Sequence, residues 1–517
     1  MTAPVKVEVV VVGSGASGSL IASRMAQAGK QTLILEAGPE RGMRNLVSSQ
    51  LWARRLKWGG SPVIEDGKQP IGYNFNAGWG VGGSAMHHYG VWPRLHEEDF
   101  DMKSRYGKGL DWPIGYDELR PHYDRVQKEV GVSGDAKAEV WRPAGDPYPM
   151  KPVPLFEQGR ILARGFAALD MQTAPLPLAV TSEAYDGRAP CIWDGWCDAG
   201  CPIGALANPL ATYLPRAEKA GAVLKANATV TRVLSDRAGK RALGVEYVTR
   251  DGTRIEQHAD VVVLAAFTVQ NPRLLLASGL ANSSGRVGQY MMTHPAGLVY
   301  GMFDEYTENH MGATGGQLLC QDGYGKNKHS NKTAFGSYQW MIAPAVKPND
   351  LLGFGTTRGD LFGAGLHDFM KQAARGFANM TAAVEDLPVA SNRLVLSGKK
   401  DEHGVPLAHV THTADEQTVA LWEHALEEGQ EVFKAAGAKT TWTGPMAAMH
   451  ILGGTIMGDD PEQSVVNSYG QTHDIANLFI AGPGLFPSSG GVNPTFTVNA
   501  LASRSSDYLL GEWGSIV

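Results

Sequence analysis

Three cysteines stand close together in the stretch CIWDGWCDAGCPIGA, residues 191–205, with the spacing C-x5-C-x3-C. They are Cys191, Cys197 and Cys201, and the rest of the 517-residue chain contains one more cysteine, Cys320. Thiolates are soft ligands that favour zinc, copper(I) and iron–sulfur clusters. Structural zinc normally takes four protein ligands in C-x2–4-C pairs, which this spacing does not supply. A [3Fe–4S] cluster takes three thiolates, so the loop is a candidate ligand set for one. A disulfide with one free thiol, or an inert loop, would also account for the cysteines.

A glycine-rich turn near the N-terminus could hold the phosphates of a dinucleotide. The turn is GSGASG, residues 13–18, a G-x-G-x-x-G between the Val-rich run 6–12 and a helical stretch. A second apolar run ends in Glu36, whose carboxylate can bind a pair of ribose hydroxyls. The free N–H groups at the start of the helix favour a pyrophosphate. Strand, helix and acid together predict a βαβ dinucleotide site, and the acid argues against NADP without separating NAD from FAD.

Two later segments favour FAD over NAD. Residues 222–258 read as short strands with turns and lead into the apolar run ADVVVLAA and a helix. Near the C-terminus, the apolar run ANLFIAGPG is followed by a Gly-rich turn and a long helix. An FAD domain is assembled from separated segments of this kind, whereas NAD enzymes do not usually return to the cofactor with their final segment.

Several motifs resemble the glucose-methanol-choline (GMC) oxidoreductase family from end to end. They are EAG at 36–38, GVGGSAMHHYGVWPR from Gly80, HILGGTIMG from His450 and GGVNPTFT from Gly490. Within the family, the Cys-containing loop and the stretch DFDMKSRYGKGLDWPIGYDELRPHYDRVQKEVGVSG resemble the bacterial FAD-dependent glucose dehydrogenases and their sugar and polyol dehydrogenase relatives. One departure is Ala481-Gly482-Pro483, where the family often has Asp-Gly after its Ala.

The resemblance implies an α/β fold in which a Rossmann-like FAD-binding domain of GMC type is interleaved with an α+β substrate-binding domain containing an antiparallel sheet. We expect the FAD domain to comprise residues 1–50, 205–300 and 445–517. Residues 51–204 and 301–444 would then form the substrate-binding and cap region, which carries the Cys-rich loop 191–204.

The resemblance also implies which residues contact the flavin nucleotide. The expected contacts are Gly13, Gly15, Ser17, Gly18, Glu36, Ala37, Gly38, Gly82, Gly83, Ser84, His87, Val230, Ala265, Gly482, Asn493, Pro494 and Thr495. In some relatives a histidine at the position of His87 is bonded covalently to the flavin. We favour noncovalent binding with His87 near the ring, and covalent attachment is the alternative.

Oxidation of an alcohol by hydride transfer needs a base for the hydroxyl proton and donors for the charge that develops. His450 can serve as the base, because histidine alone has an unperturbed side-chain pKa near neutrality. Asn493 offers both a donor and an acceptor to the same substrate oxygen. By resemblance these two residues are the catalytic pair. The helix expected from Asn493-Pro494-Thr495 would stabilise charge on the flavin through its N-terminus. Glu385 resembles a family position near the site, but we favour a solvated carboxylate on a sheet edge.

We therefore expect an FAD-dependent dehydrogenase that oxidises a hydroxyl of a sugar, glycoside or polyol. The [3Fe–4S] cluster on Cys191, Cys197 and Cys201 would pass electrons singly to an external acceptor such as cytochrome c or a quinone. One alternative is an oxidase that uses O₂ and releases H₂O₂, with structural cysteines. The other is a non-redox lyase of the same fold.

Composition limits the other functions and partners. The chain is 43% hydrophobic and 19% charged, with a formal net charge of −6 and no long Lys/Arg block, which does not suggest a nucleic-acid partner. No apolar run reaches the roughly 18 residues that a membrane span needs. The start, MTAPVKVEVVVVGSG, has no secretory pattern, so we expect a cytoplasmic protein. The resemblance implies a periplasmic one if a small partner subunit carries the export signal.

Overall fold

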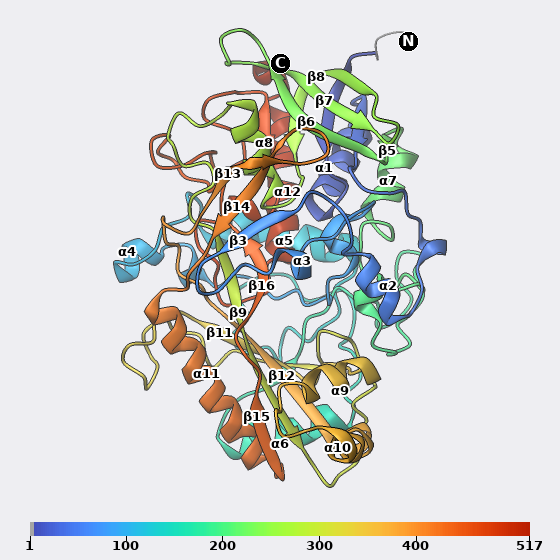
Figure 1. Ribbon diagram of the computed structural model, residues 1–517, viewed down its shortest axis with the longest axis vertical. Helices are drawn as coiled ribbons and strands as arrows, with labels where there is room; N and C mark the ends of the chain where they lie inside the picture. The colour runs from blue at the N-terminus through green and yellow to red at the C-terminus, as the bar shows by residue number, and fades with distance from the viewer. Residues whose placement is uncertain (1–4) are drawn as a thin grey trace.

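The computed structural model describes residues 5–517, so the first four residues of the expected FAD segment 1–50 lie outside it. Two seven-stranded sheets divide the molecule along its long axis, with the C-terminus beside the first sheet (Figure 1). A three-stranded sheet lies between them at one side. The predicted fold class, a Rossmann-like domain interleaved with a domain containing an antiparallel sheet, is confirmed.

The first sheet has the order β5-β2-β1-β8-β7-β6. Strand β17 pairs with the C-terminal end of β8, from Val262 to Leu264. Strands β1, β2, β5, β17 and the end of β8 run parallel, while β7 is antiparallel to both β6 and β8. The strands are β1 (Val7–Val12), β2 (Thr32–Leu35), β5 (Val223–Lys225), β6 (Ala228–Ser235), β7 (Ala242–Thr249), β8 (Arg254–Leu264) and β17 (Leu478–Ile480). The Val-rich run, the meander and the closing strand therefore meet in one sheet, as predicted.

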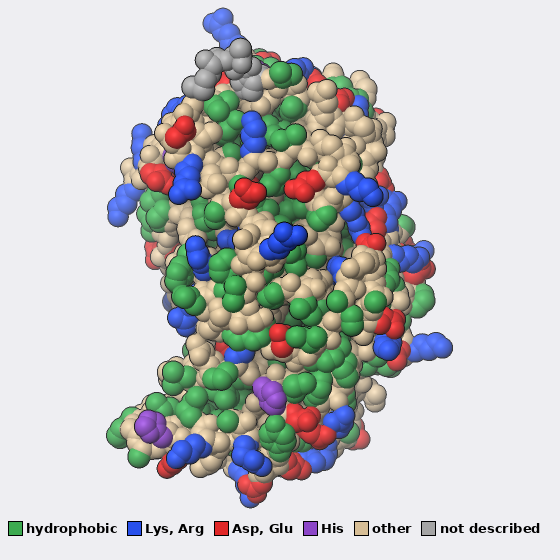
Figure 2. All heavy atoms as spheres, turned by 90° about the vertical axis from the view of Figure 1, so that its right-hand side faces the viewer, with side chains coloured by type: hydrophobic (Ala, Val, Ile, Leu, Met, Phe, Trp, Pro, Cys, Tyr) green, Lys and Arg blue, Asp and Glu red, His purple; other side chains and the backbone are tan. Residues whose placement is uncertain are grey.

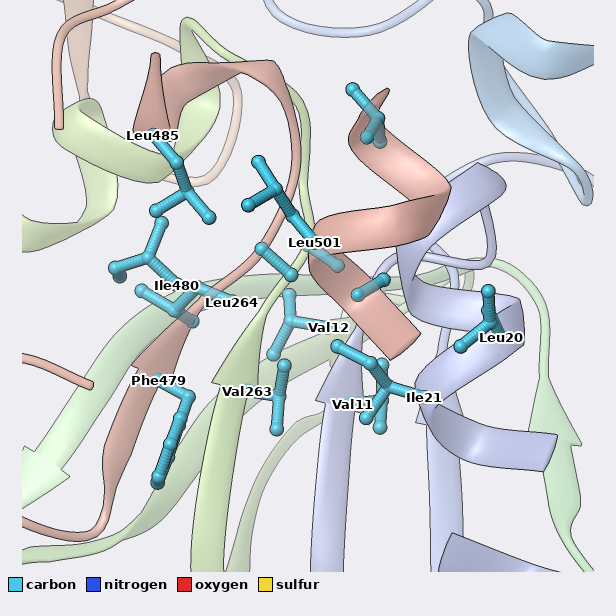
Figure 3. Packing of buried hydrophobic residues seen from close by; sticks show 14 of the residues in the cluster. Val11, Val12, Leu20, Ile21, Val263, Leu264, Phe479, Ile480, Leu485 and Leu501 are labelled. Carbon is cyan, nitrogen blue, oxygen red and sulfur yellow. The ribbon is translucent and has the colours of Figure 1, made fainter. Parts of the chain in front are cut away.

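Helices cover this sheet and bury its apolar side chains. Val11 and Val12 of β1, Val263 of β8 and Ile480 of β17 pack together with residues of α1 and α12, among them Leu501 (Figure 3). Burial of such side chains is the main stabilising term, about 1.5–3 kcal/mol for each large one. The helices near this sheet are α1 (Ala16–Gln27), α5 (Tyr116–Val130), α7 (Tyr213–Lys219), α8 (Gln270–Ser278), α12 (Thr495–Gly511) and α13 (Trp513–Ile516).

The second sheet has the order β15-β9-β12-β11-β10-β4, with β16 also paired to β9, and all its pairs are antiparallel. Its strands are β4 (Ala174–Pro175), β9 (Met292–Met302), β10 (Leu318–Cys320), β11 (Tyr338–Ile342), β12 (Phe377–Val384), β15 (Thr440–Thr443) and β16 (Ala447–Leu452). The helices beside it are α6 (Glu157–Ala168), α9 (Pro348–Gly355), α10 (Gly363–Gly376) and α11 (Glu416–Ala435). Strand β16 and most of β9 lie within the segments expected for the FAD domain but pair in this sheet.

The remaining elements are short. The third sheet contains β3 (Val63–Asp66), β13 (Arg393–Lys400) and β14 (Pro406–Thr411), and the short helices are α2 (Gln50–Arg55), α3 (Tyr73–Asn76) and α4 (Met102–Tyr106). Within residues 5–517, none of the helices has both the length and the apolar character needed to span a bilayer. On the face shown in Figure 2, Lys and Arg side chains are interspersed with Asp and Glu.

Glu385 corrects one expectation from the sequence. Its side chain is 1% exposed just after β12, and it accepts hydrogen bonds from Lys326 Nζ at 2.8 and 3.0 Å and from the Ser337 N–H at 2.7 Å. Lys326 is itself fully buried and donates to Asp99 at 2.7 Å. Glu385 is therefore one carboxylate of a buried ion cluster, and the prediction of a solvated carboxylate on a sheet edge was wrong. Pairing with a buried ammonium is what allows a carboxylate to lie in the interior.

Candidate active site

A continuous cavity of about 640 Å³ joins the carboxyl ends of the first sheet to the face of the second. Glu36, Val230 and Ala265 line it on the side of the first sheet, and Leu298 and Thr381 line it on the second. His450 and Asn493 lie in the wall between these two ends. Its volume falls within the range of sites for small ligands and cofactors, roughly 300–1,000 Å³.

Glu36 is fixed at the end of β2 by the glycine-rich turn. Its carboxylate accepts hydrogen bonds from the Ser14 N–H at 3.1 Å, the Ser14 hydroxyl at 2.7 Å and the Gly38 N–H at 2.9 Å. The Ser14 hydroxyl also accepts the Gly82 N–H at 3.0 Å, which joins the turn to the loop around residue 82. The carboxylate is thus oriented before any ligand binds and keeps oxygen lone pairs for ribose hydroxyls.

Three features of the cavity wall fit the phosphates and ring of FAD. Helices α1 and α12 both begin at the cavity without a side chain that caps their free N–H groups, so both ends attract negative charge. At Gly15 an added Cβ would meet nothing closer than 4.0 Å, which leaves open space over the turn. The Nε2 atom of His87 is buried without a partner in the same wall.

Most of the expected flavin contacts line this cavity. They are Gly13, Gly15, Ser17, Glu36, Ala37, Gly83, Ser84, His87, Val230, Ala265, Gly482, Asn493, Pro494 and Thr495. Gly18, Gly38 and Gly82 do not line it and instead shape the backbone around it. A Cβ at Gly18 would come within 2.1 Å of the Gly13 carbonyl oxygen, and Gly82 has a φ of 94°.

The predicted catalytic pair is brought together across the cavity wall. Asn493 Nδ2 lies 3.3 Å from His450 Nε2, although 43 residues separate them in the chain. Asn493 comes immediately before the N-terminal turn of α12, and His450 lies on β16. The two atoms can therefore contact one substrate oxygen in common.

A β-bulge aims His450 into the cavity. The pairing of β16 with β9 shifts between Met449 and Ile451, and His450 at the shift has a φ of 58°. Such bulges re-aim a side chain at active sites. Asn76, at the end of α3, accepts the His450 N–H at 2.9 Å and donates to the Ala448 carbonyl at 3.2 Å, which fixes the bulge from the other side.

His294 on β9 lies directly behind His450. The two Nδ1 atoms are 2.9 Å apart, and His294 Nε2 is 2.9 Å from the Gly490 carbonyl oxygen. Burial lowers the pKa of His450 well below its usual value, and repulsion between the two rings when both are charged lowers it further. The His450 ring is therefore neutral throughout the neutral pH range.

A chain of side-chain amides orients Asn493. Gln339 on β11 donates from Nε2 to Asn493 Oδ1 at 2.7 Å, and Gln321 donates to Gln339 at 3.0 Å. His96 Nε2 lies 3.1 Å from Gln321 Oε1 at the far end. Sequence reasoning missed Asn76, His294 and Gln339. The one signal was for His294, a polar residue that interrupts an apolar strand.

Cys197 and Cys201 lie in a buried apolar cluster beside the second sheet, Cys191 is partly buried and packs against it, and all three are free thiols. The Trp193 N–H donates to Cys191 Sγ at 3.3 Å, and the Leu206 N–H donates to Cys201 Sγ at 3.4 Å. Burial, followed by the charge that neighbouring thiolates would carry, raises the pKa of Cys191 and of Cys197, the latter to about 12. Across residues 5–517, His, Cys, Asp and Glu side chains form no group arranged around a single metal ion.

The loop also touches the cavity wall. Thr314, which lines the cavity, accepts the Cys197 N–H at 3.2 Å and donates to the Gly195 carbonyl at 2.7 Å. Asp198 of the loop lines the cavity itself and accepts a hydrogen bond from Lys347 Nζ at 3.3 Å. The cysteines are thus close to the site without lining it.

Comparisons with known proteins identify the family of the chain. Residues 161–296 and 388–502 match sequence profiles described as GMC oxidoreductase, and residues 11–61 match an NAD(P)-binding Rossmann-like domain. The chain is 31% identical to 2-methyl-1,2-propanediol dehydrogenase of Mycolicibacterium austroafricanum, over 99% of this chain and 96% of that one. It is also 31% identical to the fructose dehydrogenase large subunit of Gluconobacter japonicus, over 98% of each chain. A crystal structure of formate oxidase superposes with a TM-score of 0.71 at 15% identity and covers 100% of both chains. The chain therefore belongs to the GMC oxidoreductase family.

Proposed function

We propose that this protein is an FAD-dependent dehydrogenase that oxidises a hydroxyl of a sugar, glycoside or polyol and passes the electrons to an external acceptor. The observation that carries the proposal is the contact of His450 Nε2 with Asn493 Nδ2 at a cavity that continues into the nucleotide cleft. Two relatives at 31% identity, named for the dehydrogenation of a propanediol and of fructose, support a CH–OH donor.

His450 and Asn493 have different roles at the same substrate oxygen. The alcohol lies with its hydroxyl against His450 Nε2, which takes the hydroxyl proton. Asn493 Nδ2 donates to the same oxygen and turns the carbinol carbon toward the cofactor. When bound, FAD supplies the acceptor for the hydride, so that the alcohol loses two electrons and two protons in all and becomes a carbonyl. The N-terminus of α12 stabilises negative charge on the cofactor side of the site.

The finer part of the proposal assigns Cys191, Cys197 and Cys201 as ligands of a [3Fe–4S] cluster. Three thiols in one loop, of which Cys197 and Cys201 are buried and Cys191 is partly buried, support this donor set, as do the N–H groups that donate to two of their sulfurs. The contact of the loop with the cavity through Thr314 supports electron transfer from the site to the loop. The external acceptor would then be a cytochrome c or a quinone. A relative named as a large subunit supports an additional small subunit, with which the protein would reach the periplasm.

An anaerobic bleaching screen tests the proposal. The purified yellow protein is mixed with a panel of polyols, sugars, glycosides and simple alcohols, and the loss of flavin absorbance is followed. We expect bleaching by at least one polyol or sugar, followed by reoxidation that is fast with an artificial dye and slow with O₂. Fast reoxidation by O₂ with release of H₂O₂ would identify an oxidase instead. A flavin that no alcohol bleaches would contradict redox function and favour a lyase.

A further inference from the structure

The proton on His294 can be placed from its neighbours. The ring is fully buried on β9, and its Nε2 lies 2.9 Å from the Gly490 carbonyl oxygen and 3.3 Å from that of Ser489. A carbonyl oxygen can only accept a hydrogen bond, so Nε2 must carry a hydrogen. The remaining question is whether Nδ1 carries one as well.

The surroundings of His294 keep it neutral. Burial lowers the pKa of His294, although the charges of Asp386 and Asp99 oppose this effect. Both carboxylates already have partners of their own, because Asp386 lies 2.8 Å from His412 Nε2 and Asp99 lies 2.7 Å from Lys326 Nζ. A neutral ring with its hydrogen on Nε2 has a lone pair on Nδ1. His294 therefore presents an acceptor to His450.

This acceptor determines the form of the catalytic ring. With 2.9 Å between the two Nδ1 atoms, one must donate and the other accept, so the hydrogen lies on His450 Nδ1. We propose that His294 is a positioning residue that selects the Nδ1–H tautomer of His450 and so leaves the Nε2 lone pair facing the substrate hydroxyl. The inference rests on the proposed function for its catalytic meaning, but the tautomer can be measured without any substrate.

The opposite side of His450 requires the same tautomer. Gln339 donates to Asn493 Oδ1 at 2.7 Å, which turns Asn493 Nδ2, a donor, toward His450 Nε2 at 3.3 Å. In the other tautomer, two lone pairs would face each other behind the ring and two N–H donors in front of it. Because Gly490 and Asn493 belong to the loop that leads into α12, one segment supports both contacts.

The arrangement also determines where the substrate proton can go. After His450 accepts it at Nε2, the Nδ1–H still donates to His294, whose own hydrogen points at a carbonyl oxygen. A carbonyl cannot take that hydrogen, so no relay continues behind the ring. The proton must leave from Nε2 into the cavity.

Neutron diffraction from crystals of the FAD-loaded protein, exchanged into D₂O, tests the assignment directly. We expect deuterium on His450 Nδ1 and His294 Nε2, and none on His450 Nε2. Deuterium on His450 Nε2, or on His294 Nδ1, would overturn the proposal. Neither result depends on knowing the substrate, so a wrong tautomer is distinguishable from a wrong function.

Two substitutions separate tautomer selection from packing. His294→Asn keeps an oxygen acceptor at the place of Nδ1, whereas His294→Gln keeps a donor at the place of Nε2 and loses the acceptor. We expect anaerobic flavin reduction within about tenfold of wild type for Asn and slower by about a hundredfold for Gln, the usual contribution of a general base. A packing role predicts the reverse order, because Gln fills more of the space, and that order would overturn the proposal.

His329 supplies matched controls. It is another buried histidine, 7% exposed, with Nε2 at 2.7 Å from the Gly336 carbonyl oxygen, and it does not line the cavity. His329→Asn and His329→Gln should reduce flavin at the wild-type rate. If a His294 variant does not fold, as judged by FAD content and thermal unfolding, the neutron result alone tests the tautomer assigned to His450.

Discussion

Gln339 donates its Nε2–H to the Oδ1 atom of Asn493 over 2.7 Å, and this contact determines which end of the Asn493 amide faces His450. An isolated amide could present either its oxygen or its nitrogen to the substrate with equal ease. Because Gln339 receives a further hydrogen bond from Gln321 at 3.0 Å, its own orientation is fixed as well. The orientation of the Asn493 amide is thus set by two residues that do not line the cavity.

Gln339→Leu should therefore slow flavin reduction with little effect on FAD binding. Loss of the donor leaves Asn493 Oδ1 unpaired in a buried site and frees the amide to rotate, at a cost of about 1–3 kcal/mol, or roughly fivefold to a hundredfold in rate. Stopped-flow reduction under anaerobic conditions measures it. Gln257→Leu is the control, since Gln257 is also buried and hydrogen-bonded but lies in the first sheet. Equal rates for wild type and Gln339→Leu would contradict the orienting role.

His450 should act as the base down to an unusually low pH. Burial, with a smaller contribution from repulsion by His294, lowers the pKa of His450 well below its usual value. Reaction needs the neutral ring, so the reduction rate falls only as the pH drops through that lowered pKa. We expect a rate that does not change between about pH 6.5 and 8. His450→Ala should lower the rate at least about a hundredfold while retaining FAD. An acid limb centred at or above the usual histidine pKa would be inconsistent with a neutral buried base.

Glu36→Gln should weaken FAD binding. The charged acceptor of the ribose hydroxyls is lost, and hydrogen bonds to charged groups contribute about 1.5–3 kcal/mol, or roughly a tenfold to hundredfold change in Kd. Titration of the apoprotein with FAD, followed by flavin fluorescence, gives the value. Glu8→Gln alters a carboxylate on β1 that does not line the cavity and should leave the Kd unchanged. An unaltered Kd in Glu36→Gln would remove this residue from the binding site.

Cys320 serves as the control for substitutions of the three cysteines in the loop. Cys191→Ser, Cys197→Ser and Cys201→Ser should each lose the iron, while Cys320→Ser, buried in β10, should keep it. Flavin reduction by substrate should survive in all four, because none of the four cysteines takes part in the proposed hydride step at His450 and Asn493. Electron delivery to a cytochrome or quinone should fail in the first three. Iron analysis and low-temperature EPR of protein purified anaerobically and mildly oxidised provide the measurement. Iron-free wild-type protein with full acceptor activity would leave the loop a structural role.

Lys326→Met should destabilise the protein strongly. Lys326 is fully buried between Asp99 and Glu385, and removing it leaves two carboxylates unpaired in the interior. Breaking a buried pair typically costs about 3–5 kcal/mol of unfolding free energy. Urea unfolding of Lys326→Met against Lys328→Met, an exposed lysine two residues away, measures the difference. Similar midpoints for the two variants would show that the cluster contributes little.

The nucleotide site could be predicted from local sequence patterns. The residues that position His450 and Asn493 could not, because their contacts depend on pairing between strands far apart in the chain. The strand, turn and acid of residues 6–36 are set by neighbours in the chain, so periodicity and glycine spacing were sufficient there. His294 meets His450 only because β9 pairs with β16 across 156 residues. Glu385 looked solvated because its partner Lys326 is 59 residues away in a loop of no clear pattern. Contacts between side chains that lie far apart in the sequence cannot be deduced from either segment alone.

The backbone at His450 places thermal stability and catalysis in opposition. Its φ of 58° lies in the left-handed region, which costs a residue other than glycine about 1–3 kcal/mol. A glycine would adopt the same bulge without that strain, yet it would bring no base to the cavity. Selection for robustness alone would therefore drive position 450 toward glycine, and only the need for chemistry retains a histidine there. Directed evolution of this scaffold for heat resistance should find its gains elsewhere, because this strained residue of the cavity wall is also the proposed base.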